Sequence, residues 1–262
     1  MLTDKDLTWL TLQNIGEISH VRQFENALTN DVFLITLHQN RRYIFKRLNR
    51  QARSDEDRQS EFLVQQLAYQ HGLTSVVLAH SNDYKLQQYI EGELLTTKTH
   101  NLSQLLAIQL HRIHQLPALH APKQRLFFEL QRLKSQLPVA IDESRFKQFS
   151  QLAKALDSRN CADILCHGDL SLNNVLQGHN EQLYIIDWEY AVIACSAYDL
   201  AFCNCINNFT DAESKTLINN YYQQSSFKKD KTLESLQKDC VSYSKIFNYI
   251  NELWSICFVG KD

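Results

Sequence analysis

The amino-acid sequence predicts a bilobal α+β fold, in which a small β-rich N-terminal lobe precedes a larger, mostly helical C-terminal lobe. Before about residue 91, short runs of alternating apolar and polar residues are typical of strands. After Glu91-Gly92, apolar residues recur at helical spacing instead. One strand-loop-strand stretch, residues 164–187, interrupts these helices. We therefore divide the chain into an N-terminal lobe that ends in a hinge, residues 1–91, and a C-terminal lobe, residues 92–262.

The N-terminal lobe is predicted to hold a hairpin, one helix and two further strands. The hairpin strands are rich in β-branched and aromatic residues and flank a polar turn. Ser54 is a candidate N-cap with acidic residues in the following turn, and Gly72 ends the helix. The segments so assigned are residues 32–37, 42–48, 76–79 and 84–90 for the strands and 54–71 for the helix.

The C-terminal lobe is predicted to hold six helices. In the first of them, five apolar residues fall on one face: Leu102, Leu105, Leu106, Leu110 and Ile113. The six segments are residues 102–113, 123–136, 144–156, 197–207, 211–222 and 231–258.

The composition narrows the function classes. The net charge is −2, from 27 basic and 29 acidic residues, which argues against a nucleic-acid-binding protein. Seven cysteines without a CxxC pair indicate reduced thiols in the cytoplasm rather than a disulfide framework. The polar N-terminus is not that of a signal peptide, and no apolar run approaches the ~20 residues of a membrane span.

Two short motifs carry the chemistry. His167-Gly168-Asp169 is followed by Asn174, which places a carboxylate and an amide oxygen in one tight loop. Asp187 then follows an apolar strand. Phosphoryl transfer needs a carboxylate near the attacking hydroxyl and ligands that hold Mg²⁺ on the phosphates. Oxygen ligands of this kind suit Mg²⁺. A polar turn without a function is the alternative for either motif taken alone.

Together, these motifs resemble those of the aminoglycoside phosphotransferase and choline kinase superfamily, whose members are relatives of the protein kinases. The resemblance covers most of the chain and implies a protein kinase-like fold and an ATP- and Mg²⁺-dependent phosphotransferase with an alcohol group as acceptor. By this resemblance, Asp169 would be the catalytic base, while His167 would brace the loop. Asn174 and Asp187 would ligate Mg²⁺, and Asp199 would stabilise the catalytic loop.

The resemblance assigns nucleotide binding to the N-terminal lobe. Lys46 lies in mid-strand between apolar residues, and we expect it to pair with Glu61 and to reach the α- and β-phosphates. An exposed edge-strand lysine is the alternative. Further candidates lie in a glycine-free loop and in the inter-lobe hinge, whose backbone would meet adenine. They are Asn26, Thr29 and Asn30 in the loop and Gln88, Tyr89 and Ile90 in the hinge.

The segment Ile186–Ala191 resembles choline, ethanolamine and thiamine kinases more than antibiotic-modifying enzymes. Aromatic faces attract a quaternary ammonium or thiazolium group, which carries charge without hydrogen-bond donors. Tyr190, Tyr249 and Trp254 are therefore substrate-binding candidates, with Glu189 as a counter-charge. Aromatic residues at helical spacing also serve as core, which is the alternative for Tyr249 and Trp254.

The sequence thus predicts a cytoplasmic small-molecule kinase that uses ATP and Mg²⁺ and acts on an amino-alcohol or thiamine. An aminoglycoside or sugar kinase of the same superfamily is one alternative. A non-catalytic nucleotide-binding regulatory relative is another, because the loop 25–30 lacks glycine. A protein kinase ranks lower, since the long activation segment expected after Asp187 is absent from the sequence. The oligomeric state and the identity of the acceptor are left open.

Overall fold

The computed structural model describes residues 1–25, 30–49, 54–159, 163–224 and 232–258. It divides into two compact units, which are described separately. The first unit comprises Met1–Glu93 together with Leu176–Glu189, and the second comprises Leu94–Val175 together with Tyr190–Asp262. The segment Leu176–Glu189 therefore packs with the first unit, although it follows most of the second in the sequence.

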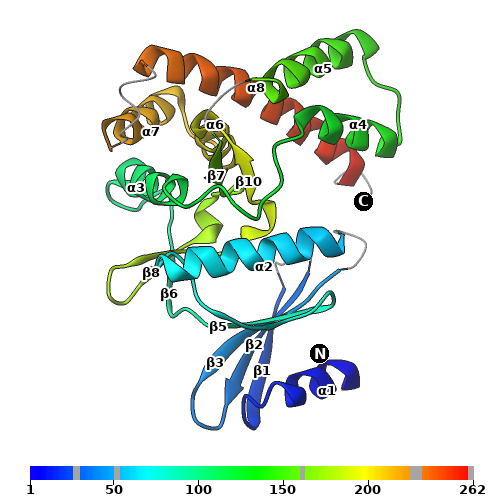
Figure 1. The fold of residues 1–262 in the computed structure, drawn as a ribbon, viewed down its shortest axis with the longest axis vertical. Coiled ribbons are helices and arrows are strands. Elements are labelled where there is room, and N and C mark those ends of the chain that lie inside the picture. Colours follow the sequence, from blue (N-terminus) through cyan, green and yellow to red (C-terminus); the bar gives the residue numbers. More distant parts are fainter. Residues whose placement is uncertain (26–29, 50–53, 160–162, 225–231, 259–262) are drawn as a thin grey trace. The chain divides into compact units, whose positions relative to one another are not determined.

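The first unit is built on a five-stranded antiparallel sheet with the strand order β1-β2-β3-β5-β4 (Figure 1). Two helices, α1 (Asp4–Leu12) and α2 (Asp55–Gln70), cover it. The strands are β1 (Ile18–Phe24), β2 (Asp31–Leu37), β3 (Arg42–Arg47), β4 (Val77–His80) and β5 (Tyr84–Gln88). The predicted hairpin, the helix and both further strands are thereby confirmed, with β5 ending at Gln88, the first residue of the predicted hinge.

Strand alternation gives the two faces of this sheet different chemistry. Phe33, Phe45 and Leu86 are register partners and lie in an apolar core with Leu10 of α1. Because successive side chains point to opposite faces, Lys46 and its register partner Lys85 lie on the other face, under α2. Both lysines are buried. The face under α2 therefore requires carboxylate partners, which the candidate site provides.

Helix α1 was not expected from the sequence. Thr3 begins it with a capping box, in which Thr3 and Asp6 exchange hydrogen bonds between side chain and backbone. Trp9 contacts the rings of Phe45 and Tyr84 at centroid distances of 5.9 and 5.1 Å. Tertiary packing therefore stabilises a short helix whose sequence pattern is weak.

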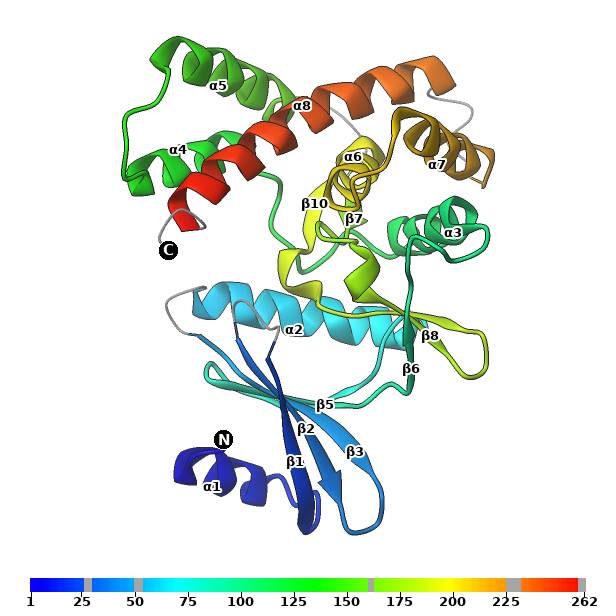
Figure 2. The same ribbon diagram turned by 180° about the vertical axis from the view of Figure 1, so that it is seen from behind.

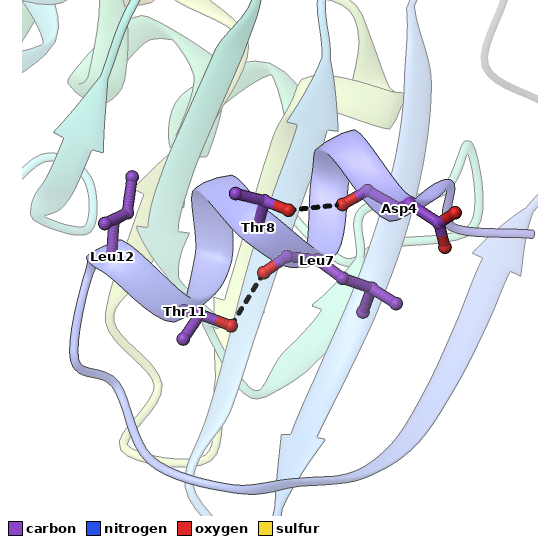
Figure 3. Close-up of a pocket in the computed structure, with 5 residues that line it drawn as sticks. All are labelled: Asp4, Leu7, Thr8, Thr11 and Leu12. Atoms are coloured by element: carbon purple, nitrogen blue, oxygen red, sulfur yellow. Dashed lines mark hydrogen bonds between the residues drawn. The ribbon is translucent and has the colours of Figure 1, made fainter.

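The outer face of α1 carries a shallow surface depression (Figure 3). The hydroxyl of Thr8 donates to the carbonyl of Asp4, and that of Thr11 donates to the carbonyl of Leu7, at 2.8 Å each. Every lining residue comes from this one helix and is exposed. Because these hydroxyls are turned back onto the backbone, the depression has no converging polar groups and is not a candidate active site.

A second, three-stranded sheet has the order β6-β8-β9. Its strands are β6 (Gly92–Leu94), β8 (Val175–Gly178) and β9 (Leu183–Ile185). Gly92 allows a close approach here, since a Cβ atom at this position would lie 2.4 Å from the carbonyl oxygen of Gln177. The Ile185 amide donates to the Leu73 carbonyl at 2.7 Å, which fixes β9 against the end of α2.

The second unit contains the six predicted helices, which confirms the α+β class with a β-rich first part and a mostly helical second part. Helix α8 runs alongside α4, α5 and α6 (Figure 2). A two-stranded antiparallel ribbon of β7 (Ile164–Cys166) and β10 (Val192–Ala194) lies among the helices. The helices are α3 (Leu102–His114), α4 (Leu126–Gln136), α5 (Glu143–Asp157), α6 (Ser196–Ile206), α7 (Asp211–Gln224) and α8 (Leu233–Phe258).

Two predictions about the chain as a whole can be compared with the described residues. The six cysteines within them are free thiols, and five of these are buried. Across the same residues, none of the helices combines the length and the apolar character needed to cross a bilayer.

Candidate active site

The loop after β7 carries the first motif, and a glycine sets its shape. Gly168 has a positive φ of +76°, a conformation that L side chains rarely adopt. A Cβ atom at this position would lie 2.1 Å from the carbonyl oxygen of Tyr190. Only glycine therefore fits between His167 and Asp169.

Asp199 of α6 holds this loop from behind. Its carboxylate accepts hydrogen bonds from the amides of His167 and Gly168, at 2.8 and 3.0 Å. His114 Nε2 lies 3.1 Å from the same carboxylate, and His114 Nδ1 lies 2.7 Å from the hydroxyl of Tyr221. These contacts confirm the predicted stabilising role of Asp199, and they give His114 a structural role.

Asp199 is fully buried, and its surroundings nevertheless stabilise the ionised form of its carboxyl group. Burial by itself would raise the pKa of this carboxyl, but the hydrogen bond and the charge of His114 act against burial, as do the charge of His167 and the Gly168 amide. The net effect lowers the pKa of Asp199 below its usual value. The loop is thus anchored by an ionised carboxylate.

Asp169 and Asn174 lie together in the loop. The side-chain amide nitrogen of Asn174 donates to Asp169 Oδ2 at 3.0 Å and to the Asp169 carbonyl at 2.8 Å. The Asp169 amide donates to His167 Nδ1 at 3.3 Å, which links the two motif residues on either side of Gly168. Since the nitrogen of Asn174 faces Asp169, its oxygen Oδ1 is the atom suited to a metal ion.

Asn207 is a second anchor of this loop that sequence reasoning missed. Its side chain accepts from the Leu172 amide at 2.8 Å and donates to the Leu170 carbonyl at 3.1 Å. It is the C-cap of α6, eight residues after Asp199. The motif gave no signal for it, because an asparagine that follows a helix usually serves as a cap.

The first unit carries the second motif. Asp187 has a φ of +65°, a conformation that is uncommon for residues other than glycine and concentrates at functional sites. Lys46 Nζ donates to Asp187 Oδ1 at 2.9 Å. Burial alone would lower the pKa of Lys46, but the charges of Asp187 and Glu61 outweigh it and raise this pKa overall. Lys46 is therefore a cation held beside Asp187.

The predicted ion pair between Lys46 and Glu61 is wrong. Among the described residues, the ion pairs of Glu61 are with Lys85 and with Arg58, the latter at 3.4 Å. Lys46 and Lys85 are opposite each other on β3 and β5, so both reach the face under α2, and Lys85 takes the carboxylate of Glu61. Lys85 was missed because the register between the strands is not visible in the sequence, whereas Arg58 lies three residues before Glu61 on α2 itself.

The side chains of the two motifs offer the type of ligand atom that Mg²⁺ binds. Asp187 offers a carboxylate and Asn174 an amide oxygen, both of which are hard oxygen ligands. Asp187 belongs to the first unit and Asn174 to the second.

The predicted substrate-binding residues fall into two groups. Tyr190 and Trp254 are exposed, at 48% and 42%. Tyr249 is buried and stacks on Phe149 with ring centroids 4.1 Å apart. Glu189 is also buried and lies 3.6 Å from Arg58. Tyr190 and Trp254 are therefore partly accessible to solvent, whereas packing covers Tyr249.

The predicted nucleotide-binding residues are only partly within the described chain. Asn26 and Thr29 lie outside the described residues. Asn30 Oδ1 accepts from the Asn49 amide at 3.1 Å, which ties the end of the loop to the residues after β3.

In the predicted hinge, two amides already donate within the protein. The Gln88 amide donates to the Val76 carbonyl at 3.0 Å, and the Tyr89 amide donates to the Arg42 carbonyl at 3.1 Å. A base bound at this hinge would therefore have to use the carbonyl groups or the amide of the half-buried Ile90.

Comparisons with known proteins identify the family and the fold of the chain. The sequence model described as "Phosphotransferase enzyme family" matches residues 20–235. Among solved structures, the choline kinase LicA from Streptococcus pneumoniae is 22% identical, with a TM-score of 0.75 over 98% of this chain and 92% of that one. LicA in complex with AMP also matches, at a TM-score of 0.74 and 22% identity over 98% and 90% of the two chains.

Two further solved structures show the same fold. A choline/ethanolamine kinase family protein from Mesorhizobium loti is 17% identical, with a TM-score of 0.73 over 98% of this chain and 87% of that one. The macrolide 2'-phosphotransferase MphH from Brachybacterium faecium is 13% identical, with a TM-score of 0.69 over 97% and 93%. No curated protein sequence matches the chain.

Proposed function

This chain belongs to the phosphotransferase enzyme family and is a small-molecule kinase, and we propose that it uses ATP and Mg²⁺ to phosphorylate the hydroxyl group of an amino-alcohol or of thiamine. The observation that carries this proposal is the loop in which Asn174 and His167 hold Asp169, with Asp199 behind them. A carboxylate fixed in this way can accept a proton from an attacking hydroxyl.

The proposed reaction is an in-line displacement. The acceptor hydroxyl loses its proton to Asp169 as its oxygen bonds to the γ-phosphorus of ATP. The bond from that phosphorus to the bridging oxygen breaks, and ADP leaves with the electron pair. Lys46 would neutralise phosphate charge, since it is a buried cation on a rigid strand. Mg²⁺, held by Asp187 and Asn174, would neutralise further charge on the phosphates.

The acceptor class rests on the exposed rings of Tyr190 and Trp254 in the second unit. Each can contribute roughly 0.5–2 kcal/mol to binding a cation that it faces. Choline and ethanolamine kinases among the structural neighbours support the same class. The macrolide phosphotransferase shares the fold and makes a larger, hydroxylated acceptor the second candidate.

An ADP-release screen tests the proposal. Choline, ethanolamine, thiamine, homoserine, methylthioribose, an aminoglycoside and a macrolide are each supplied with ATP and Mg²⁺. We expect one of the first three to stimulate ADP release. In Asp169→Asn, this stimulated rate should fall by about 10³-fold or more, since the base is lost.

Asp163→Asn is the matched control. Asp163 precedes β7, is exposed, and forms a surface ion pair with Lys123, so its loss should leave the rate unchanged. Stimulation by a sugar or macrolide alone would reject the amino-alcohol assignment. Full turnover in Asp169→Asn, with its circular dichroism spectrum unchanged, would reject the mechanism.

A further inference from the structure

Glu189 was predicted from the sequence as a counter-charge for a cationic acceptor, but its surroundings favour another role. Glu189 is buried, at 8% exposure, whereas the next residue, Tyr190, is 48% exposed. Glu189 ends the segment that packs with the first unit, and Tyr190 belongs to the second. The Glu189 carboxylate lies 3.6 Å from the guanidinium group of Arg58. It therefore already neutralises a buried cation of its own unit.

Arg58 joins segments that are far apart in the chain. It lies near the start of α2 and is buried, at 5% exposure. Its Nη2 atom donates to Asn30 Oδ1 at 3.4 Å and to the Asn49 carbonyl at 3.2 Å. Its Nη1 atom lies 3.4 Å from the Glu61 carboxylate and 3.6 Å from that of Glu189. The planar fork of a guanidinium group engages several partners in fixed directions, which the single ammonium group of a lysine does not.

Two of these partners adjoin residues assigned to the nucleotide. Asn30 ends the glycine-free loop 25–30, and its Oδ1 atom also accepts from the Asn49 amide at 3.1 Å. Glu189 comes two residues after Asp187, the predicted Mg²⁺ ligand. All of these residues belong to the first unit. Arg58 therefore ties the end of the loop to the segment that carries Asp187.

The turn from Asp187 to Glu189 is short and firmly packed. Trp188, between them, is fully buried, and its indole nitrogen donates to the Ile185 carbonyl at 3.1 Å. Because successive residues of a packed turn cannot move independently, a shift of the Glu189 carboxylate would also move Asp187.

The charge of Glu189 also acts on Lys46. Burial lowers the pKa of this lysine, but the charges of Asp187 and Glu61 raise it. The charge of Glu189 acts in the same direction as these two carboxylates. Glu189 thus belongs to the charges that surround the lysine on the nucleotide side of the proposed site.

We propose that Glu189 and Arg58 are positioning residues for ATP with Mg²⁺: their ion pair holds the Asp187 segment and the end of the glycine-free loop in place within the first unit. Glu189 then supports nucleotide binding and is not the counter-charge of the acceptor. The identity of the ligand, ATP with Mg²⁺, rests on the proposed function.

Glu189→Gln removes the charge and keeps the shape of the side chain. Isothermal titration calorimetry measures the Kd for AMP-PNP with Mg²⁺ and the Kd for choline. We expect the Kd for AMP-PNP to rise about tenfold, as is typical when the partner of a metal ligand is lost. The Kd for choline should not change. In the control Glu143→Gln, which loses a surface ion pair with Lys134, neither Kd should change.

Other outcomes of this measurement would overturn the inference. Weaker binding of choline with an unchanged Kd for AMP-PNP would make Glu189 the counter-charge of the acceptor. A merely structural role predicts a lower melting temperature, with both Kd values of the folded protein unchanged. If Glu189→Gln fails to fold, Glu189→Asp takes its place, because it keeps the charge and withdraws the carboxylate from Arg58. The same selective rise in the Kd for AMP-PNP is expected.

Arg58→Lys and the double variant Arg58→Lys/Glu189→Gln test whether the two residues act through each other. Arg58→Lys keeps the positive charge but loses the fork that reaches Asn30 and Asn49. We expect the double variant to bind AMP-PNP at most about threefold more weakly than the weaker single variant. Two independent effects would multiply instead, and this result would overturn the pairing.

Hydrogen–deuterium exchange of the nucleotide-free protein separates this inference from the proposed function. In Glu189→Gln we expect faster exchange in peptides that cover residues 30–34 and 185–190, and in Glu143→Gln no change. Unchanged exchange of both segments in Glu189→Gln would overturn the inference, whatever the enzyme phosphorylates. Failure of the wild-type protein to bind AMP-PNP would instead count against the proposed function, and the exchange data would still decide the inference.

Discussion

Gly168 shows how one residue without a side chain shapes the candidate catalytic loop. Its positive φ and its contact with the Tyr190 carbonyl are two separate reasons for glycine. Gly72 also has a positive φ, of +68°, but the nearest atom to a Cβ there is the side-chain nitrogen of Gln182 at 3.9 Å. An alanine at Gly72 would therefore introduce backbone strain alone, whereas an alanine at Gly168 would introduce strain and steric overlap together.

We expect Gly168→Ala to lower the free energy of unfolding by about 2–5 kcal/mol, because strain and overlap add. Gly72→Ala should cost only about 1 kcal/mol, since the new methyl group meets only the Gln182 side chain, at an ordinary van der Waals distance. Urea denaturation of both variants measures the difference. Equal losses would mean that the loop moves away from Tyr190 at little cost, and that its conformation is not tightly fixed.

Among the residues of the candidate site, the sequence predicted Asp169, Asn174 and Asp187 because their roles depend on short spacings. The anchor Asp199 was also predicted, from the local motif around it. Lys85, the strand partner of Glu61, could not be found in this way. It depends on which residues of β3 and β5 are opposite each other, and that register is a tertiary property.

At the scale of secondary-structure elements, α6 holds the loop after β7 through charge. The Asp199 carboxylate meets two backbone amides and His114 where no water can replace them. Helix α3 contributes His114, which contacts the carboxylate, and α7 contributes Tyr221, which contacts His114 in turn. The stability of the loop should therefore depend on the ionisation of this single group.

The pKa of Asp199 is lowered in the folded protein, while an unfolded aspartate titrates near about 3.9. Its contribution to stability is thus fully present above about pH 4 and is lost as the pH falls through the lower folded-state pKa. Asp199→Asn removes this titration. At pH 7 we expect the variant to be less stable by roughly 2–4 kcal/mol, because an amide cannot satisfy all the donors.

The prediction is checked by measuring the unfolding free energies of the wild type and of Asp199→Asn as a function of pH. The gap in unfolding free energy between wild type and Asp199→Asn should be constant near neutral pH and shrink below about pH 4. Asp163→Asn, at an exposed position, should run parallel to the wild type throughout. A gap that stays constant down to pH 2 would show that the charge of Asp199 does not stabilise the fold.

The helices and strands themselves were mostly predictable, but helix α1 and strand β1 were not among the predicted segments. For α1 the reason is physical. Long amphipathic segments such as α3 and α5 bury one face, so their periodicity is visible in the sequence. Helix α1 is short and buries only Asp6 and Leu10. Its position is set by Trp9, Phe45 and Tyr84, which lie far apart in the chain. Pattern alone does not predict a helix of this kind.

At the scale of the whole molecule, the two units carry complementary parts of the proposed chemistry. The first unit holds Lys46 and Asp187, and the second holds Asp169, Asn174 and Asp199. The chain passes from the second unit to the first between Asn174 and Asp187. Under the proposed function, ATP with Mg²⁺ would engage the metal ligands of both motifs, whereas ATP without the metal ion would not.

This difference predicts how ligands stabilise the protein. ATP with Mg²⁺ at about 100 times its Kd should add about 2.7 kcal/mol to the free energy of unfolding. For a chain of this size, that corresponds to a rise in melting temperature of roughly 5–10 °C. ATP with EDTA should give a smaller rise. Differential scanning fluorimetry of the wild-type protein measures both.

Asp187→Asn should abolish the difference between ATP with Mg²⁺ and ATP with EDTA, because an amide is a poorer ligand for Mg²⁺ than a carboxylate. Glu181→Gln is the control: Glu181 is an exposed acidic residue in the turn between β8 and β9 of the same hairpin, and its loss should leave the Mg²⁺-dependent rise unchanged. A Mg²⁺-dependent rise that persists in Asp187→Asn would place the metal ion on other ligands. The assignment of Asp187 and Asn174 as the Mg²⁺ ligands would then be wrong, even if the enzyme phosphorylates an amino-alcohol.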